Sequence, residues 1–528
     1  MDSNEVITTE SDLAELCERE YRVDPSIPKD SPISNFFAGK TVLLTGPTGF
    51  LGHLLLEKIL RIGVKRVYVL MREKKNRNSR ERLEKVCKGP VFQHLPKYDP
   101  NFLDRIEIVT GDLSQPRLGI QSNAILEELK ENIEIVIHAA ADVRFNEPLY
   151  NLIWCNLVGT RDLLELSKQM PKLMVFVYMS TAFSNTKENS ENKIAEKFYE
   201  PPMNADILID YVQAHRSEND QDLLNMIAPN LIEPWPNNYT FSKALSESVV
   251  RRYSNDFPIA VIRPTIVIST YADPIMAWSN SYGGMNGVVA GIGGGLLRNL
   301  FFKSVELNIV CADFVTNGSL AAAWHTCNEY GRNQFEAKIY HINRVSDPAL
   351  IFDNTVSYLV QVGRRLVVPM NSVWYTVCQK TYCDWHDDLL RIIYQAIPSM
   401  IMDLFISSPK YKLTPIVRKM KTFAEVIKFF IHNEFVFAND NLFDVINRMT
   451  EYDRKYFICD PRVVDWKKYY IVYIIGGRKH LLRDSFDNFE QACKRMTRLK
   501  YLHYTLKYTC IALILFIFYQ LFLKKFLI

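Results

Sequence analysis

Short apolar runs alternate with helical patterns along the first 270 residues of the chain. The runs with the length and composition of buried strands are 41–45, 66–72, 106–112, 133–141, 172–180 and 259–267. Between them, segments such as 52–63 and 159–170 repeat apolar residues at helical spacing. Nearly continuous apolar strands that alternate with helices are typical of a parallel sheet covered by helices on both faces. The pattern therefore predicts an α/β fold with a doubly wound parallel sheet.

This alternation stops near residue 355, and the remaining pattern is mainly helical. We therefore expect an α/β domain at 37–350, preceded by a polar leader at 1–36 and followed by a helical domain at 351–500. Two folded parts fit the length, because single cores stop growing at about 250–300 residues. A stretch with seven glycines at 283–295 is expected to be a flexible surface loop or a substrate lid.

The most apolar segment lies at 508–523 and contains no charged residue. As a helix it spans about 24 Å, slightly less than the ~30 Å hydrocarbon core of a bilayer. Lys507, Lys524 and Lys525 flank it and are long enough to reach the interface from a shorter helix. We expect a transmembrane helix at 506–523, and the alternative is an amphipathic helix or a helix packed in the protein core.

The charges around this helix predict its orientation. Five basic residues precede it and two follow it; the five are Lys494, Arg495, Arg498, Lys500 and Lys507. Basic residues are in excess on the cytosolic side of membranes, so we expect the folded domains in the cytosol. The acidic start is unlike a secretory signal, and five residues follow Leu523, so we expect insertion after translation. The endoplasmic reticulum is the favoured membrane and the peroxisome the alternative.

Composition narrows the possible classes of protein. Hydrophobic content is 48% and charged content 23%, as in globular proteins, and a net charge of +4 gives no reason to expect nucleic-acid binding. Ten cysteines are scattered without a CxxC pair, which favours reduced thiols over a disulfide framework. Cys383 and His386 form a CxxH, but no second pair of ligands accompanies them, so no metal site is expected.

A glycine-rich loop follows the first predicted strand. The sequence GPTGFLG places Gly46, Gly49 and Gly52 between a strand and a helix, the context of a dinucleotide-binding Rossmann fold. These glycines permit a tight turn, close approach to the pyrophosphate and close helix packing, while the helix N-terminus offers free N–H groups. The residues expected to bind the dinucleotide here are Thr45, Gly46, Thr48, Gly49, Phe50, Leu51 and Gly52.

The residues after the second strand predict which dinucleotide is bound. An NAD enzyme usually carries an acidic residue there for the ribose 2′-OH, whereas this chain has Arg72, followed by Lys74 and Lys75. A guanidinium suits a 2′-phosphate, so NADPH is the predicted cofactor; the alternative is a solvated basic turn. Asp112, after the third strand, is expected to meet the adenine amino group. The small residues expected to lie against the cofactor are Ala139, Ala140 and Ala141.

A tyrosine and a lysine four residues apart provide candidate acid chemistry. Tyr239 and Lys243, in YTFSK, would lie on one face of a helix. An adjacent ammonium is expected to lower the tyrosine pKa from its ordinary value near 10, which would make the phenol a proton donor. Ser180 and Thr181, at the end of the fifth strand, each offer a second hydroxyl, and the spacing favours Thr181. The alternative for this pair is an ordinary turn.

Together these motifs resemble the extended short-chain dehydrogenases and, more closely, the alcohol-forming fatty acyl-CoA reductases. The motifs in the first part of the chain are GPTGFLG, HAAADVRF (138–145), NLVGTRDLLELS (156–167), MSTAFSN (179–185), YTFSKALSE (239–247) and RPTIV (263–267). The resemblance continues through VCADFVTNGSLAAAW (310–324) and into a helical region at 437–470, and it covers roughly residues 35–490.

The resemblance implies an NADPH-dependent reductase anchored to a membrane. Such enzymes reduce long-chain acyl-CoA to a primary alcohol with two NADPH, through a hemithioacetal and an aldehyde. By the same resemblance, Tyr239 is the proton donor, Thr181 or Ser180 assists it, and Lys243 also binds the nicotinamide ribose. Pro264, in RPTIV, is expected to contact the cofactor.

Three positions depart from that family's pattern. Tyr178 stands where histidine is common, Phe183 where tyrosine is common, and Gly294 where many members carry a basic residue. The last difference removes an expected contact to CoA phosphate, for which Arg298 or Lys303 is a substitute.

Two other functions share some of these features. A membrane-bound hydroxysteroid or sterol dehydrogenase would carry the loop and the Tyr-x-x-x-Lys pair but would not need the C-terminal helical region. A non-catalytic NADPH-binding scaffold would not need Tyr239, Lys243 and Thr181 together. Acyl chain length, release of the aldehyde and oligomeric state are outside what the sequence predicts.

Overall fold

The computed structural model describes residues 30–520, apart from 74–77, 192, 216, 331–335, 345–350, 366 and 410–411. Several sequence-predicted features fall outside this described part. They are most of the polar leader, the basic residues Lys74 and Lys75, the expected domain boundary at 350, and the end of the apolar segment with Lys524 and Lys525.

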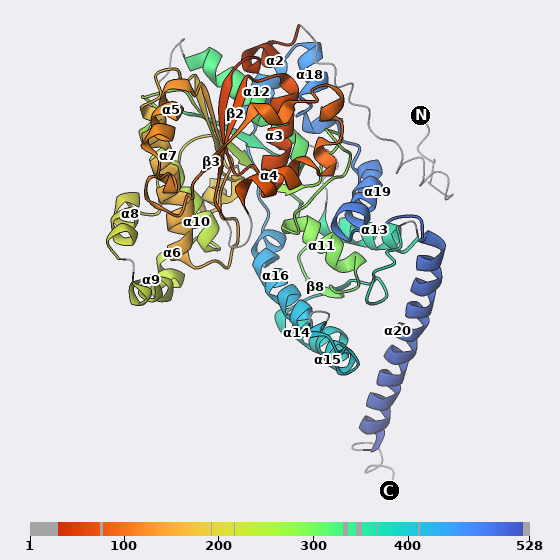
Figure 1. Ribbon diagram of the computed structural model, residues 1–528. Helices are drawn as coiled ribbons and strands as arrows, with labels where there is room; N and C mark the ends of the chain where they lie inside the picture. The colour runs from red at the N-terminus through yellow and green to blue at the C-terminus, as the bar shows by residue number, and fades with distance from the viewer. Residues whose placement is uncertain are drawn as a thin grey trace.

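Seven parallel strands form the central sheet, in the order β10-β6-β5-β4-β1-β2-β3 (Figure 1). The strands are β1 (Thr41–Thr45), β2 (Arg66–Met71), β3 (Ile106–Thr110), β4 (Ile135–His138), β5 (Val175–Met179), β6 (Ile259–Pro264) and β10 (Lys338–Ile342). The predicted doubly wound Rossmann-type sheet is therefore confirmed. The sequence order reverses between β1 and β4, and ligands of such folds bind at this switch point.

One predicted strand is divided into two in the structure. The run 259–267, expected as one strand, forms β6 and then β7 (Ile266–Ile268), which pairs with β9 (Ile309–Cys311) outside the main sheet. The N–H of Thr265 still bonds to the Ile342 carbonyl at 3.1 Å, but the N–H of Ile266 bonds to the Asn308 carbonyl at 3.0 Å. The chain changes partner just after Pro264, which has no N–H for the ladder.

Alternate residues of the strands bury apolar side chains on opposite faces of the sheet. On β1, Val42 and Leu44 belong to the core beneath α3 (Phe50–Ile62) and α12 (Ala312–Tyr330), whereas Leu43 belongs to the core on the other face. The helices of that other face are α5 (Asn123–Asn132), α6 (Leu149–Leu152), α7 (Gly159–Lys168), α8 (Ala205–Ala214), α9 (Glu218–Leu231) and α10 (Asn238–Arg252). These two layers explain why the strands are apolar throughout.

The region after β10 is mainly helical, as predicted. Its helices are α13 (Phe352–Arg365), α14 (Asp384–Arg391), α15 (Ile397–Leu404), α16 (Thr414–His432), α17 (Asp440–Arg448), α18 (Glu451–Tyr456), α19 (Trp466–Gly476) and α20 (Phe489–Phe518). A short strand, β11 (Gln379–Thr381), pairs with β8 (Asn299–Phe301) of the earlier region. One buried apolar cluster contains residues from both sides of residue 350, so the division into two domains stays a prediction.

Two short helices lie before and after the first two strands of the sheet, α2 ahead of β1 and α4 after β2. Pro32–Phe37 forms α2, in which Ile33 and Phe37 are fully buried, so the predicted leader boundary at 36 falls inside a packed helix. Ser79–Cys87 forms α4. The hydroxyl of Ser31, which caps α2, donates a hydrogen bond to Asp453 in α18. The start of α2 therefore contacts the C-terminal region of the chain.

The glycine-rich stretch is not a flexible surface loop, because most of it forms the buried helix α11 (Gly284–Gly293); the alternative of a substrate lid stays a prediction. Two of its glycines lie where a side chain would be crowded. A Cβ atom at Gly287 would lie 2.3 Å from the Tyr282 carbonyl oxygen and 2.7 Å from the ring of Phe423 in α16, and one at Gly291 would lie 3.1 Å from the Cβ of Leu297. The surface-loop alternative was wrong because glycine marks close helix contact as well as flexibility.

Helix α20 runs away from the body of the molecule (Figure 1). Its first half packs on the body through Ala492, Met496 and His503, and its second half, from Tyr508 onward, is exposed and apolar. Within the described residues, this is the helix that is long and apolar enough to cross a membrane. The alternative of a core helix is therefore wrong for the described part, because the apolar residues of that half are not buried.

Candidate active site

A mainly apolar cavity opens at the carboxyl ends of β1, β4 and β5, where the switch point lies. It has a volume of about 340 Å³ and is bordered by the start of α3, one face of α10, and parts of α11 and α16. The sequence-predicted residues that line it are Gly49, Phe50, Leu51, Gly52, Ala139, Ala141, Ser180, Thr181, Tyr239, Lys243 and Pro264. Residues from five separate motifs thus meet at one place.

The glycine loop has the geometry expected of a phosphate cradle. Gly46 has φ +74°, and a Cβ there would lie 2.8 Å from the Cα of Ala140. A Cβ at Gly52 would lie 1.9 Å from the Gly46 carbonyl oxygen, so any side chain would force the loop away from α3. Gly49 caps α3 without a side-chain hydrogen bond. The first turn of α3 therefore offers free backbone N–H groups at the edge of the cavity, beside the side chains of Phe50 and Leu51.

Thr45 and Thr48 act differently from the glycines. The Thr45 hydroxyl is fully buried; it lies 2.8 Å from Nδ1 of His138 and accepts a hydrogen bond from the Ala140 N–H at 3.1 Å. Thr45 thus ties the end of β1 to the end of β4 and lies behind the cavity wall. Thr48 lies in the turn between β1 and α3.

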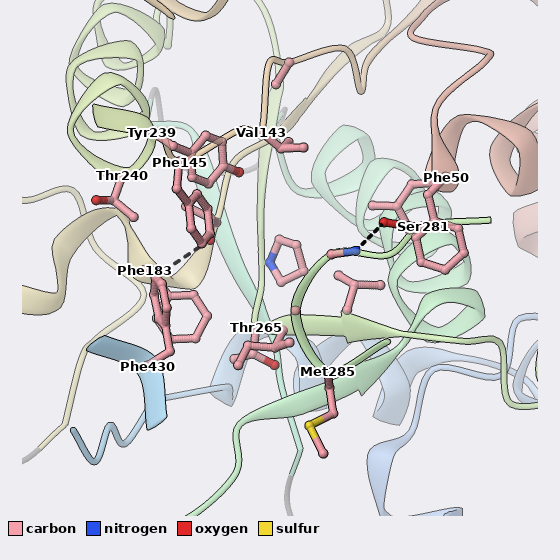
Figure 2. A pocket seen from close by; sticks show the side chains of 18 of the residues that line it. Phe50, Val143, Phe145, Phe183, Tyr239, Thr240, Thr265, Ser281, Met285 and Phe430 are labelled. Carbon is pink, nitrogen blue, oxygen red and sulfur yellow. Dashed lines mark hydrogen bonds between the residues drawn. The ribbon is translucent and has the colours of Figure 1, made fainter. Parts of the chain in front are cut away.

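Tyr239 and Lys243 lie one turn apart in α10, and both reach the cavity. Figure 2 shows the Tyr239 ring beside Phe145, at a centroid distance of 5.5 Å, with Phe183 and Phe430 nearby. Burial raises the pKa of Tyr239, and a hydrogen bond from Thr181 offsets this only in part. The expected lowering of its pKa by Lys243 is therefore wrong for this structure, where Tyr239 is a neutral phenol at pH 7.

Lys243 is turned toward the end of β5 rather than toward Tyr239. Its ammonium donates a hydrogen bond to the Met179 carbonyl at 2.7 Å and lies 3.4 Å from the Tyr178 hydroxyl and 4.7 Å from the Tyr178 ring. Burial lowers the pKa of Lys243 to about 8, so it still carries its charge at pH 7. Burial, aided by Lys243, lowers the pKa of His138 to about 3, so that this ring is neutral.

Ser180 and Thr181 are distinguished by their partners. The Ser180 hydroxyl donates to the carboxylate of Glu247, whereas the Thr181 hydroxyl is hydrogen-bonded to Tyr239. Glu247 is held in turn by Arg263 through two hydrogen bonds of 2.9 and 2.6 Å, and both side chains are almost fully buried. The geometry therefore favours Thr181 over Ser180 as the hydroxyl that assists Tyr239. Ser180 instead contributes to the buried hydrogen bonds around Glu247.

Sequence reasoning missed this Glu247–Arg263 pair. Glu247 lies four residues after Lys243 and eight after Tyr239, so all three share one face of α10. That spacing was a signal available in YTFSKALSE, but its partner Arg263 is on β6 and no local pattern connects the two. A further missed residue is Asn156, whose amide bonds to the carbonyl of Asp142 and to Ser242 of α10.

Arg72 and Asp112 lie apart from the main cavity. Both line a second cavity of about 400 Å³ beyond the ends of β2 and β3, together with Asp142 and Arg144. Arg72 is exposed, and the Asp112 carboxylate accepts hydrogen bonds from the Ser114 N–H at 3.0 Å and hydroxyl at 2.7 Å. The predicted adenosine end and the predicted reacting end thus correspond to two adjoining parts of the same sheet edge.

Apolar side chains form the side of the main cavity that faces away from the glycine loop. They come from helices α11, α13 and α16 and from the segment before β9: Met285, Val288, Leu307, Phe352, Ile427, Phe430 and Ile431. Phe183, one of the departures, packs edge-on against Phe430 at 4.9 Å. Of the two proposed CoA contacts, Arg298 is buried against the Trp374 ring at 4.9 Å, while Lys303 is exposed.

Two family models match separate parts of the chain. Residues 44–319 match a family model described as male sterility protein, and residues 394–484 match a second model with that description. The fatty acyl-CoA reductase wat of Drosophila melanogaster is 34% identical over 508 residues, covering 95% of each chain. Fatty acyl-CoA reductase 1 of Homo sapiens is 31% identical over 483 residues, covering 89% of this chain and 90% of that protein.

Solved structures share the fold at lower identity. The reductase domain of a nonribosomal peptide synthetase from Mycobacterium tuberculosis aligns with a TM-score of 0.56 at 19% identity, covering 88% of this chain and 97% of that one. The terminal reductase domain of the myxalamid pathway aligns with a TM-score of 0.52 at 17% identity, covering 89% and 98%. By its relatives and its dinucleotide-binding fold, the chain is an oxidoreductase that uses a nicotinamide cofactor, and it belongs to the fatty acyl-CoA reductase family.

Proposed function

We propose that the protein reduces long-chain fatty acyl-CoA to the primary alcohol with two molecules of NADPH, through a hemithioacetal and an aldehyde. The observation that carries this proposal is the position of Tyr239, hydrogen-bonded to Thr181 at the border between a glycine cradle and an apolar cavity. A polar donor pair at that border suits a substrate with a reactive carbonyl on a long apolar chain.

The residues present fit a dinucleotide. Gly46, Gly49 and Gly52 leave backbone close to the space that a pyrophosphate needs, and Arg72 and Asp112 border the second cavity. We assign the phosphates to the start of α3, the adenosine to the second cavity and the nicotinamide to the main cavity, near Lys243 and Pro264. When bound, NADPH supplies the hydride.

The protein's own groups would handle the developing negative charge. Tyr239, kept protonated by its raised pKa, donates a hydrogen bond to the carbonyl oxygen, and Thr181 donates to Tyr239. A donor placed in advance at such an oxygen is typically worth about 3 kcal/mol. Tyr239 then gives its proton to the alkoxide in the aldehyde step, and the hydrogen bond from Thr181 stabilises the resulting phenolate.

We infer that α20 anchors the protein in a membrane with the α/β region in the cytosol. The exposed apolar second half of α20 supports this, as does the excess of basic residues before it. We propose the endoplasmic reticulum rather than the peroxisome as the membrane. We also retain the division into an α/β domain at 37–350 and a helical domain at 351–500.

Tyr239→Phe is expected to lower kcat for palmitoyl-CoA by roughly 10²–10⁴-fold, the usual contribution of a general acid, with NADPH affinity nearly unchanged. The measurement is NADPH oxidation together with a fluorescence titration of NADPH. Tyr340→Phe is the matched control, because Tyr340 is also fully buried and hydrogen-bonded but does not line the cavity. Retention of more than about a tenth of the rate, a loss below ~1.4 kcal/mol, would show that Tyr239 is not the proton donor.

Arg72→Glu is expected to raise the KM for NADPH by roughly 10–100-fold, because hydrogen bonds to charged groups contribute about 1.5–3 kcal/mol. The KM for NADH should change much less, since NADH has no 2′-phosphate. Arg66→Glu, at the opposite end of the same strand and also exposed, controls for the change in net charge. Equal losses for both cofactors would contradict a 2′-phosphate contact at Arg72.

Deletion of residues 506–528 is expected to give a protein that alkaline carbonate extracts from membranes and that still oxidises NADPH with acyl-CoA. The full-length chain should stay in the carbonate-washed pellet, because a bilayer-spanning helix resists extraction. Protease added to intact microsomes should digest the reductase region. The anchor is excluded if the shortened chain stays in the pellet, and the orientation is excluded if protease spares that region.

A further inference from the structure

Helices α14 and α15 are joined by the π turn η7 (Ile392–Ala396) and form one continuous helical rod. This rod buries polar side chains and exposes apolar ones, the reverse of the usual arrangement. The buried residues of this rod are polar: Asp387, Arg391, Gln395 and Ser399 recur every fourth position and are 2–7% exposed. A helix at a water-exposed surface normally buries its apolar stripe and exposes its polar face.

The outer face of the rod carries large apolar side chains at helical spacing. We call this surface the α14–α15 patch and define it by Trp385, Ile392, Ile397, Met400, Leu404 and Phe405. Trp385 is 70% exposed, Leu404 82% and Phe405 83%. An exposed apolar patch of this kind marks a contact with a membrane or another protein.

The inversion is built into the fold, because the buried polar residues have specific partners. Asn299 of β8 donates to the Asp387 carboxylate at 2.7 Å and accepts a hydrogen bond from Gln395. Thr381 of β11 also donates to Asp387, at 2.8 Å, and Arg391 pairs with the same carboxylate. The rod therefore cannot rotate to bury its apolar face without losing these bonds.

The position of helix α20 indicates that a lipid bilayer covers the α14–α15 patch. Tyr394, in η7, lies against His503 of α20, with ring centroids 6.4 Å apart. His503 is five residues before Tyr508, where the exposed apolar half of α20 begins. Figure 1 shows α14 and α15 at the same end of the molecule, toward which α20 runs. A bilayer that receives the second half of α20 would thus meet the patch at its surface.

Charge favours a lipid surface over another protein core. The carboxylates on and beside the rod are engaged: Asp384 with Lys428, Asp388 with Lys421, and Asp403 with the N–H groups that start α16. In contrast, Arg418 and Lys419 are exposed, and neither forms an ion pair with a carboxylate in the described part of the chain, while the charge of Lys412 is offset by Asp403. The residual charge beside the patch is positive, which attracts anionic headgroups.

We propose that the α14–α15 patch is a second membrane-contact surface, which inserts its apolar face into the interfacial region of an anionic lipid bilayer. Trp385 would occupy the headgroup boundary, where tryptophan is favoured, and Leu404 and Phe405 would enter the acyl layer. This surface is separate from the tail helix: α20 would cross the bilayer, whereas the rod would lie in the plane of its surface. Helix α16 begins beside the patch and its C-terminal half lines the catalytic cavity.

Tryptophan quenching in bilayers tests this surface on the full-length chain. The protein has seven tryptophans and α20 contains none of them, and Trp385 is the most exposed of those described. The protein is reconstituted in vesicles of phosphatidylcholine and phosphatidylserine, in which the phosphatidylcholine carries bromine high on its acyl chains. We expect brominated lipid to quench part of the emission, and Trp385→Phe to remove most of that quenching.

A charge variant gives a second, independent readout. Leu404→Glu with Phe405→Glu should reduce the quenching of Trp385, because two carboxylates oppose insertion, while both side chains are too exposed to affect the core. Met226→Glu is the matched control: Met226 is 71% exposed on α9, away from α20 in Figure 1, and this change should leave quenching unaltered.

The proposal is overturned if Trp385→Phe leaves the quenching unchanged, or if full-length protein shows no quenching by brominated lipid. It is also overturned if Trp385 becomes shielded from aqueous acrylamide only as protein concentration rises in detergent, since that indicates contact between copies. These results are independent of carbonate extraction, so failure of the tail anchor and failure of the patch are distinguishable.

Discussion

The register of α10 against the end of β5 is the constraint on which the site depends. Tyr239, Lys243 and Glu247 share one face of this helix, and each is fixed by a different contact. Glu247 is clamped by Arg263 of β6, Lys243 is bonded to the Met179 carbonyl, and Tyr239 is packed by Phe145. Because the clamp is buried, its carboxylate and guanidinium need each other. It therefore positions the two residues that the proposed chemistry uses.

The sequence predicted the sheet well, because buried parallel strands are local apolar runs and the glycine loop has a fixed context. The spacing of Tyr239 and Lys243 also predicted correctly that they lie one turn apart in a helix. The sequence did not predict the contacts between residues that lie far apart along the chain. β10 was missed because KIYHI is short, the partner of Glu247 lies on another strand, and Gly287 of the glycine-rich stretch packs against Phe423 of α16. The pKa of Tyr239 was misjudged because spacing indicates which face a lysine is on but not where its ammonium points.

The inverted rod at α14–α15 shows a similar limit. In sequence its apolar and polar residues alternate at helical spacing, which is the usual sign of a helix packed on a core. Only the structure shows that the polar stripe faces inward, toward Asn299 and Thr381. With α20 beside it, the rod gives the molecule an end suited to lipid, and α16 connects that end to the cavity. A reductase whose substrate and product both partition into membranes would benefit from this arrangement.

The central claim is that the cavity beside Tyr239 carries out both reductions of an acyl thioester. The most direct measurement is the stoichiometry of the wild-type reaction with palmitoyl-CoA, with NADPH oxidised, free CoA and hexadecanol determined in the same samples. The account predicts two NADPH oxidised and one alcohol formed for each CoA released. One NADPH per CoA with accumulation of aldehyde, or NADPH oxidation with a sterol substrate and none with palmitoyl-CoA, would contradict it.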